Sequence, residues 1–264
     1  MREHGLVQSA ADLGLHGHVC WTYDDDAELI RAAAAFLADG VRLGQRLIYV
    51  ASGPLDRLHA QVEEMARVNR LVREGALEIL SLDATYAADT GTDPEALLAI
   101  FATATEQALA DGFTGLRVVG DGTTLAADPR NWAEHTRWEA VSDRFMASKP
   151  YSGLCCYDSR VLPPQILQDL CAVHPVAHAP AENVPFRLYA DRDALVLDGE
   201  VDYFAADRLR RVLGAAAPPG AVLDLGQVEF VDHHAAVALA ESGLPLRAMP
   251  HSMRRTCELL GLRA

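Results

Sequence analysis

The sequence has 264 residues, of which 50% are hydrophobic and 23% charged, and its formal net charge at pH 7 is −14. This composition excludes a disordered chain, and the acidic balance argues against direct nucleic-acid binding, which normally needs a basic surface. No apolar run approaches the roughly 18–20 residues that span a bilayer, and the N-terminus lacks a signal-peptide pattern, so we expect a cytoplasmic protein that does not bind membranes.

Strands and helices alternate along the first two thirds of the chain. The predicted strands are short apolar runs, which is typical of strands covered by helices on both faces. This pattern predicts an α/β fold with a doubly wound, mainly parallel sheet. The expected strands are residues 19–21, 45–51, 77–82, 115–120 and 151–157, and the expected helices are residues 24–39, 54–72, 93–110, 131–146 and one that begins at 163.

Residues 179–185 break this alternation, because two prolines among small and polar residues favour a linker. We therefore predict an N-terminal tail over residues 1–15, a first domain over 16–178 and a smaller α/β domain over 186–264. The expected elements of the smaller domain are strands at 186–189, 194–202, 221–225 and 228–232, a helix over 203–213 and helices after residue 232.

Sequence motifs for catalysis are missing. Lys149 is the only lysine and lies outside any glycine-rich loop, so the chain has no standard phosphate-binding loop. Neither G-x-S-x-G nor H-E-x-x-H occurs, and the five cysteines form no C-x-x-C pair. We therefore expect a protein that is not an enzyme and has no cofactor. A divergent nucleotide- or metal-dependent enzyme in the first domain, or an oligomerisation scaffold, are the alternatives.

The second domain contains several ordered motifs of one signalling family. They are Gly-Glu-Val-Asp at 199–202, Val-Leu-Asp-Leu at 222–225, Phe-Val-Asp at 230–232 and a final helix pattern at 253–262. Residues 186–264 therefore resemble the STAS family, which includes bacterial anti-sigma-factor antagonists. The resemblance implies a small sheet flanked by helices that binds a protein partner, an anti-sigma factor or a related kinase-fold regulator.

The STAS resemblance also implies where the partner binds. The surface would be formed by Phe230, Asp232, His233 and His234, at the start of a helix. Switchable family members carry a phosphorylated serine directly after the aspartate, where this chain has His233. We therefore expect partner binding that is not controlled by phosphorylation at this position.

The first domain carries a second set of ordered motifs. They are His-Val-Cys at 18–20, Gly-Phe-Thr-Gly-Leu-Arg-Val-Val-Gly-Asp at 112–121, Cys-Cys-Tyr-Asp at 155–158 and His-Pro at 174–175. Residues 16–178 resemble the MEDS family, a sensory domain of methanogens, methylotrophs and a dichloromethane-responsive repressor. The resemblance implies sensing of a small molecule, and a RecA-like layout without the phosphate-binding loop.

Ligands of open α/β sheets bind beyond the carboxyl ends of the strands. The residues that we expect to contribute to such a site are His18, Trp21, Tyr23, Asp121 and Tyr157. Core packing is the alternative role for Trp21 and Tyr157, and helix capping or pairing with an arginine is the alternative for Asp121.

His16 and His18 have the spacing that places both on one face of an extended segment. With Cys156, His174 or His178 they offer an alternative interpretation, a metal or haem site. The sequence contains no compact ligand motif, so we expect no metal site and assign these histidines to structural or surface positions.

Together the two resemblances predict a non-catalytic signalling protein. Its MEDS-like domain would sense a small molecule, and its STAS-like domain would bind a regulator and so act indirectly on transcription. The sequence leaves the ligand, the partner and any homo-oligomer open.

Overall fold

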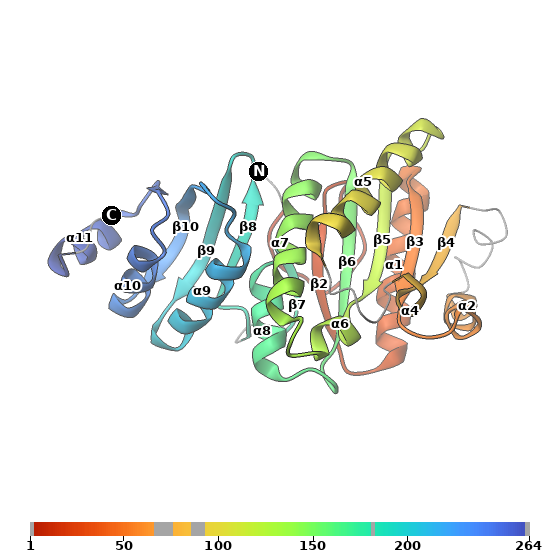
Figure 1. Cartoon of the computed structure of the whole chain (residues 1–264), viewed down its shortest axis with the longest axis horizontal. Helices are drawn as coiled ribbons and strands as arrows, with labels where there is room; N and C mark the ends of the chain where they lie inside the picture. Colours follow the sequence, from red (N-terminus) through yellow and green to blue (C-terminus); the bar gives the residue numbers. More distant parts are fainter. Residues whose placement is uncertain (1–2, 66–75, 86–92, 181–182, 262–264) are drawn as a thin grey trace.

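The larger of two sheets has seven strands, and all of its pairings are parallel (Figure 1). The computed structural model describes residues 3–65, 76–85, 93–180 and 183–261. The strand order across the large sheet is β1 (Gly5–Leu6), β7 (Val176–His178), β2 (His18–Tyr23), β6 (Tyr151–Asp158), β5 (Leu116–Asp121), β3 (Arg46–Ala51) and β4 (Leu77–Ser81).

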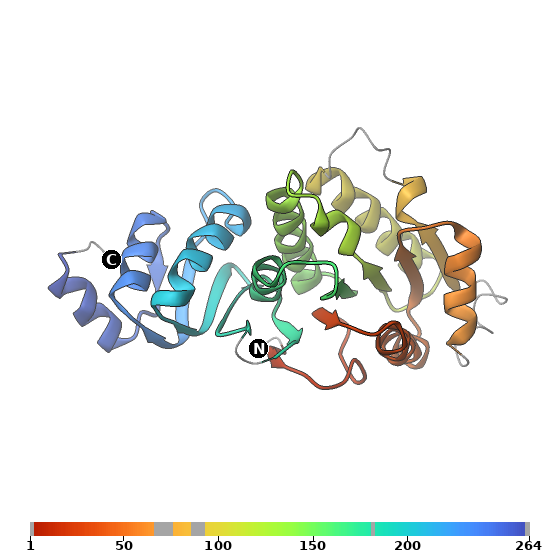
Figure 2. The same ribbon diagram turned by 90° about the horizontal axis from the view of Figure 1, so that it is seen from below.

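Helices cover both faces of this sheet, as the apolar strands predict (Figure 2). The apolar residues of α1 (Asp26–Leu43) and α2 (Leu55–Glu64) share one core with the strands. On the opposite face pack α5 (Pro94–Ala110), α6 (Thr123–Ala127), α7 (Trp132–Ser148) and α8 (Pro164–Ala172). A short helix, α4 (Leu82–Thr85), follows β4.

The smaller sheet has four strands in the order β11 (Leu246–Arg247), β10 (Leu223–Val231), β9 (Ala194–Val201) and β8 (Phe186–Asp191). The β8–β9 pair is antiparallel, and the other two pairs are parallel. The helices that follow these strands are α9 (Tyr203–Ala216), α10 (His233–Glu241) and α11 (His251–Leu259).

The structure confirms an α/β fold with a parallel sheet and differs from the sequence in detail. The two strands predicted at 221–225 and 228–232 form one strand, β10, whose register shifts twice against β9. The predicted tail contributes β1, which pairs with β7, a strand that the sequence did not indicate. The end of the helix predicted at 54–72 and parts of the predicted linker and final helix motif (181–182 and 262) lie outside the described residues.

Arg117 is a fully buried arginine that ties separate segments of the first domain together. Its guanidinium donates hydrogen bonds to Gln45 Oε1 and to the backbone carbonyls of Leu13, Gly14 and Phe36. Burial lowers the pKa of this guanidinium to about 10, although Asp39 partly opposes the effect. The carbonyl groups replace the water that the cation loses on burial.

The two sheets share an interface formed by α7 and α8. Ala140, Ala172 and Val173 belong to the same apolar core as the smaller domain. Arg211 pairs with the buried Asp169 through two hydrogen bonds of 3.0 and 3.1 Å. The interface therefore combines apolar packing with an ion pair, and this combination favours one fixed arrangement of the two domains.

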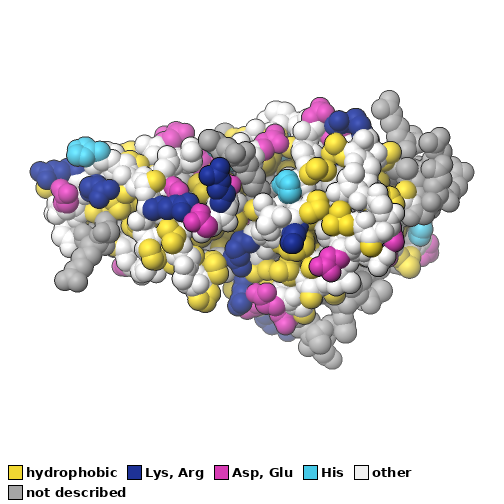
Figure 3. Space-filling model, turned by 90° about the horizontal axis from the view of Figure 1, so that it is seen from above, with side chains coloured by type: hydrophobic (Ala, Val, Ile, Leu, Met, Phe, Trp, Pro, Cys, Tyr) yellow, Lys and Arg dark blue, Asp and Glu magenta, His cyan; other side chains and the backbone are white. Residues whose placement is uncertain are grey.

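On the face in Figure 3, acidic and basic side chains of the described residues are interspersed, and hydrophobic side chains gather over the larger domain. Among the described helices, none combines the length and apolar character that crossing a membrane requires.

Two helical glycines allow a matched test of this packing. A Cβ at Gly40 would lie 2.4 Å from Leu47 and 2.7 Å from Arg117, whereas a Cβ at Gly214 of α9 meets no atom within 4 Å. We expect Gly40→Ala to lower the free energy of unfolding by about 1–3 kcal/mol, because Arg117 is held by its hydrogen bonds. Gly214→Ala should raise it by about 0.5–1 kcal/mol. Urea unfolding of both variants measures the difference, and equal effects would contradict the close packing at Gly40.

Candidate functional site

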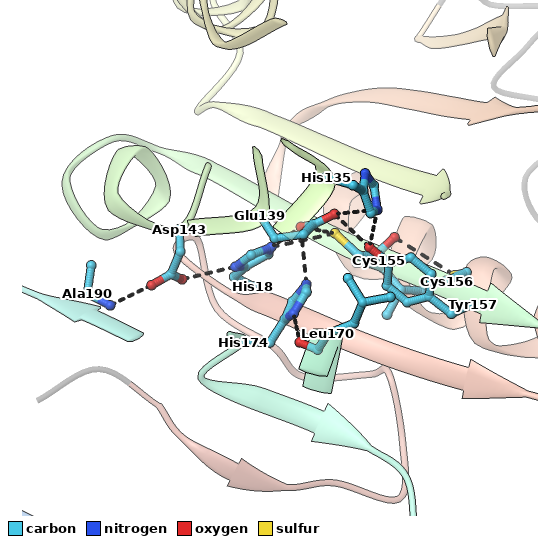
Figure 4. A network of polar contacts seen from close by, with 11 residues as sticks. His18, His135, Glu139, Asp143, Cys155, Cys156, Tyr157, Leu170, His174 and Ala190 are labelled. Atoms are coloured by element: carbon cyan, nitrogen blue, oxygen red, sulfur yellow. Dashed lines mark hydrogen bonds and ion pairs between the residues drawn. The ribbon is translucent and has the colours of Figure 1, made fainter. Parts of the chain in front are cut away.

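A network of buried polar side chains lies between α7 and strands β2 and β6 (Figure 4). His135, Glu139 and Asp143 are four residues apart on α7 and therefore share one face of the helix. Cys155 and Tyr157 alternate with Cys156 along β6, so these two side chains face α7 while Cys156 packs in the core on the α1 side. The first residue of β2, His18, and the residue His174 after α8 complete the network.

Glu139 is the centre of the network. Its Oε2 atom lies 3.1 Å from His18 Nε2, 3.2 Å from His174 Nε2 and 3.3 Å from Cys155 Sγ. Its Oε1 atom accepts a 2.7 Å hydrogen bond from the Tyr157 hydroxyl. The carboxylate is only 2% exposed, so these groups take the place of solvent.

A second set of contacts orients the histidines. His18 Nδ1 lies 3.0 Å from Asp143 Oδ1, and His174 Nδ1 donates a 2.8 Å hydrogen bond to the Leu170 carbonyl. His135 Nε2 lies 2.9 Å from the Tyr157 hydroxyl, and its Nδ1 has no hydrogen-bond partner among the described residues. Contacts other than those with Glu139 therefore help to fix the ring positions.

Burial and neighbouring charges set the protonation of the network. Burial alone would raise the pKa of Glu139, but the histidines His174 and His18 hold it well below its usual value. Burial by itself would lower the pKa of His18. The nearby carboxylates of Asp143 and Glu139 outweigh this effect, so the pKa of His18 is raised. Burial lowers the pKa of both His135 and His174. The surrounding histidines thus favour the ionised form of Glu139.

The hydrogen-donating partners of Glu139 keep their protons. Burial raises the pKa of Cys155 and of Tyr157 well above their usual values, and the negative charge of Glu139 adds to this effect. The network by itself therefore offers no thiolate nucleophile at neutral pH.

A cavity of about 90 Å³ adjoins the network. Most of its lining is apolar and comes from β3, β4, β5, β6 and the helices α5 and α7. Polar residues of the network, among them His135, Glu139 and Tyr157, form part of the wall, and Asp121 at the end of β5 also lines the cavity. Ile100 of α5 lines the cavity and is 53% exposed, so the cavity approaches the surface there. An apolar pocket with a few convergent polar groups is the usual form of a small-molecule site.

The structure brings together some of the predicted ligand-binding residues. His18 and Tyr157 belong to the network, and Asp121 lines the cavity and accepts a 3.0 Å hydrogen bond from the Tyr23 hydroxyl. Asp121 also accepts a hydrogen bond from the backbone of Thr123, in the capping role considered as an alternative. Tyr23 itself points to the α1 side of the sheet, whose core it joins.

Trp21 lies away from the network. Its ring packs in the core on the α1 side and stacks on His178 at 3.8 Å. His16 is exposed, and its Nδ1 lies 2.9 Å from the carbonyl oxygen of Met146 and 2.8 Å from that of Lys149. In the alternative metal-site interpretation, His16 and His18 would lie with Cys156, His174 or His178. The structure brings His18 to His174, whereas Cys156 packs in the core on the α1 side.

The sequence analysis did not identify the polar residues of α7 that belong to the site. His135, Glu139 and Asp143 recur every four residues in the predicted helix 131–146, on the side that a helix normally buries. Polar residues at this spacing on a buried face were the available signal. No sequence pattern singles out Cys155, because its contact with Glu139 depends on the pairing of β6 with its neighbours.

The residues predicted to bind a partner lie at one end of the smaller sheet. Asp232 caps α10 by accepting a hydrogen bond from Ala235, and Phe230 is 49% exposed. The rings of His233 and His234 lie 4.0 Å apart. These two histidines form, with two aromatic residues that the sequence did not single out, an aromatic patch of four residues: Tyr203, Phe204, His233 and His234.

A family model described as the methanogen/methylotroph, DcmR sensory domain (MEDS) matches residues 17–175. The chain belongs to the MEDS family. This confirms the expected family of the first domain, and the name indicates a sensory role in signalling or regulation. No curated protein matches the chain. The matched residues include the whole network and the cavity, so both belong to the MEDS domain.

Glu139 should be essential to the stability of the MEDS domain. We expect Glu139→Ala to lower the free energy of unfolding by about 3–5 kcal/mol, because the buried partners of the carboxylate lose their acceptor. Glu134→Ala, at an exposed position of the same helix, should change it by less than about 0.5 kcal/mol. Denaturant unfolding of both variants checks this, and a loss at Glu139 no larger than at Glu134 would contradict the assigned pairing.

Proposed function

We propose that this protein is a non-catalytic regulator whose MEDS domain binds a small, largely apolar molecule in the cavity beside Glu139. The observation that carries the proposal is that one helix, α7, lines the cavity and also forms the interface with the smaller domain. A change in the cavity can therefore reach the second domain through a single rigid element.

The lining of the cavity indicates the chemistry of the ligand. Its aliphatic and aromatic walls favour apolar groups, for which burial contributes about 25 cal/mol per Å². The carboxylates of Glu139 and Asp121 offer hydrogen-bond acceptors. We infer a small apolar molecule that carries one donor group, such as an alcohol.

The path to the second domain begins at Asp143. One carboxylate oxygen lies 3.0 Å from His18 in the network, and the other accepts a 2.6 Å hydrogen bond from the backbone of Ala190 in β8. One residue further along α7, Arg144 donates to the carbonyl of Ala216 at the end of α9. A ligand that binds two arrangements of α7 with unequal affinity would shift their populations.

For the second domain we propose a STAS-like role. Its support is the sequence resemblance, the sheet of one antiparallel and two parallel pairs, and the exposed aromatic patch at the start of α9 and α10. The partner would be an anti-sigma factor or related kinase-fold regulator, bound in the cytoplasm, and the effect on transcription indirect. His233 offers no hydroxyl for phosphorylation, so control would come from the MEDS domain.

We also propose that the MEDS domain is a RecA-like layer without nucleotide chemistry. The turn before α1 contains Asp24 and Asp25, and Asp25 caps the helix by accepting a hydrogen bond from Ala27. Carboxylates at this helix N-terminus would repel the phosphate that a phosphate-binding loop accommodates.

Benzyl alcohol and toluene test the cavity, because the two probes are similar in size and differ in a hydroxyl. We expect benzyl alcohol at about ten times its Kd to raise the Tm by about 2–4 °C, and toluene to bind less tightly. Ile100→Trp should block the cavity and remove the shift. Leu109→Trp, at another exposed site of α5, should preserve it. Equal Tm shifts in Ile100→Trp and Leu109→Trp would show that benzyl alcohol binds outside the cavity.

The aromatic patch should carry the partner affinity. Phe204 is 84% exposed, and an exposed aromatic residue of this kind is a typical hot spot of protein interfaces. We expect Phe204→Ser to weaken binding of a kinase-fold regulator, captured from cell extract and then purified, by about tenfold or more. Leu259→Ser on α11, equally apolar and 73% exposed, serves as the control. Unchanged affinity in Phe204→Ser, measured by calorimetry, would exclude the patch as the binding surface.

A further inference from the structure

Four side chains of the network point their metal-ligating atoms at one another. They are His18, Glu139, Cys155 and His174, and one ligand atom from each lies within 4.8 Å of the others (Figure 4). They come from β2, α7, β6 and the segment after α8. We propose that these four residues form a tetrahedral site for a zinc ion inside the MEDS domain.

The distances between the ligand atoms fit such a site. Zinc bonds of about 2.0–2.1 Å to nitrogen and oxygen and about 2.3 Å to sulfur place N and O ligands about 3.3 Å apart, and sulfur about 3.5 Å from either. Glu139 Oε2 lies 3.1 and 3.2 Å from the Nε2 atoms of His18 and His174. Cys155 Sγ lies 3.3 Å from Glu139 Oε2 and 3.5 Å from His18 Nε2. Four of the six edges of a tetrahedron around one ion are thus close to the expected lengths, and the other two are within 4.8 Å.

The hydrogen bond of His174 provides an independent argument. The Leu170 carbonyl can only accept, so the ring proton of His174 resides on Nδ1. A neutral ring then turns the lone pair of Nε2 toward the carboxylate of Glu139, 3.2 Å away. This Nε2 is buried and has no hydrogen-bond partner among the described residues. Two facing acceptors repel each other unless a proton or a metal ion lies between them, and a metal ion can bind both.

The contacts outside the four ligands have the form that metal-binding histidines require. His18 Nδ1 faces Asp143, and His174 Nδ1 faces a backbone carbonyl. Such partners hold the Nε2 lone pairs toward the metal and make the ligands more basic. His135, by contrast, is bound to the Tyr157 hydroxyl and remains outside the ligand set.

The ligand chemistry favours zinc over magnesium or calcium. Two imidazoles and a thiolate suit a borderline-soft ion, whereas magnesium and calcium need mostly oxygen ligands. On binding, the Cys155 thiol and His18 Nε2, which faces Glu139 in the metal-free site, each release a proton to solvent, and Cys155 coordinates as a thiolate. The charges of that thiolate and of Glu139 then balance Zn²⁺, and both imidazoles bind neutral.

The site goes beyond the proposed sensory function and does not depend on it. Glu139 and Cys155 also line the cavity, so the ion would lie beside the proposed ligand pocket. Metal content and spectra are measured without any organic ligand. Failure of the metal site therefore leaves the cavity proposal standing, and the reverse also holds.

Metal analysis of the full-length protein tests the site. The protein is analysed once as purified without chelator and once after reconstitution with Zn²⁺. We expect about one zinc ion per chain, and Co²⁺ added to the metal-free protein should give a thiolate-to-cobalt charge-transfer band with tetrahedral d–d bands. Cys155→Ser should lose the charge-transfer band and most of the zinc. Cys156→Ser is the matched control, since the neighbouring side chain faces the opposite side of β6.

The proposal is overturned if the wild-type protein takes up no stoichiometric metal under either condition. It is also overturned if cobalt binds without a thiolate band, or if Cys155→Ser retains zinc and spectrum like Cys156→Ser. If Cys155→Ser does not fold, the cobalt spectrum of the wild-type protein tests the proposed thiolate ligand by itself. Circular dichroism of each variant separates loss of metal from loss of fold.

Discussion

A carboxylate stays ionised inside a protein only if other groups replace the water that it loses, and Glu139 imposes this requirement on the MEDS domain. Its two oxygens contact histidine, tyrosine and cysteine side chains from three separate segments, which are β2, β6 and the residues after α8. Because each partner is itself polar and buried, each must be oriented by a further contact. The Leu170 carbonyl and Asp143 provide those contacts for the two histidines nearest to the carboxylate. The position of α7 relative to the sheet is therefore fixed by electrostatics as well as by apolar packing.

The same constraint explains why cavity, network and domain interface lie together. Strands β5 and β6 and helix α7 leave an apolar space, and Glu139 introduces charge at its wall. Asp143, one turn further along the helix, is shared between His18 and the backbone of β8. A buried ion pair of this kind responds strongly to any change in local charge, because the surrounding dielectric is low. Binding beside Glu139, of an organic ligand or of an ion, is thus placed to alter the contact with the second domain.

The second domain presents a different kind of surface. Phe204 and Tyr203 at the start of α9 are exposed beside the two histidines of α10. The strands that precede these helices, β9 and β10, contribute buried residues to the core of the smaller domain. Exposed aromatic groups clustered at the ends of neighbouring parallel strands favour binding to another molecule rather than folding stability. Helices α7 and α8 therefore connect the proposed internal site of the MEDS domain with the smaller domain that carries this aromatic patch.

The sequence by itself determined the α/β class, the order of most strands and helices, and the MEDS family of residues 17–175, because these depend on local periodicity and on ordered motifs. It also indicated His18, Asp121 and Tyr157. The tertiary structure alone decided that His18 meets Glu139 and His174, which are 121 and 156 positions away in the chain. Strand pairing brings β2 beside β6, and the crossing of α7 over both strands sets which side chains face each other. No local pattern encodes such contacts, which is why Trp21 was expected in the site and Glu139 was not.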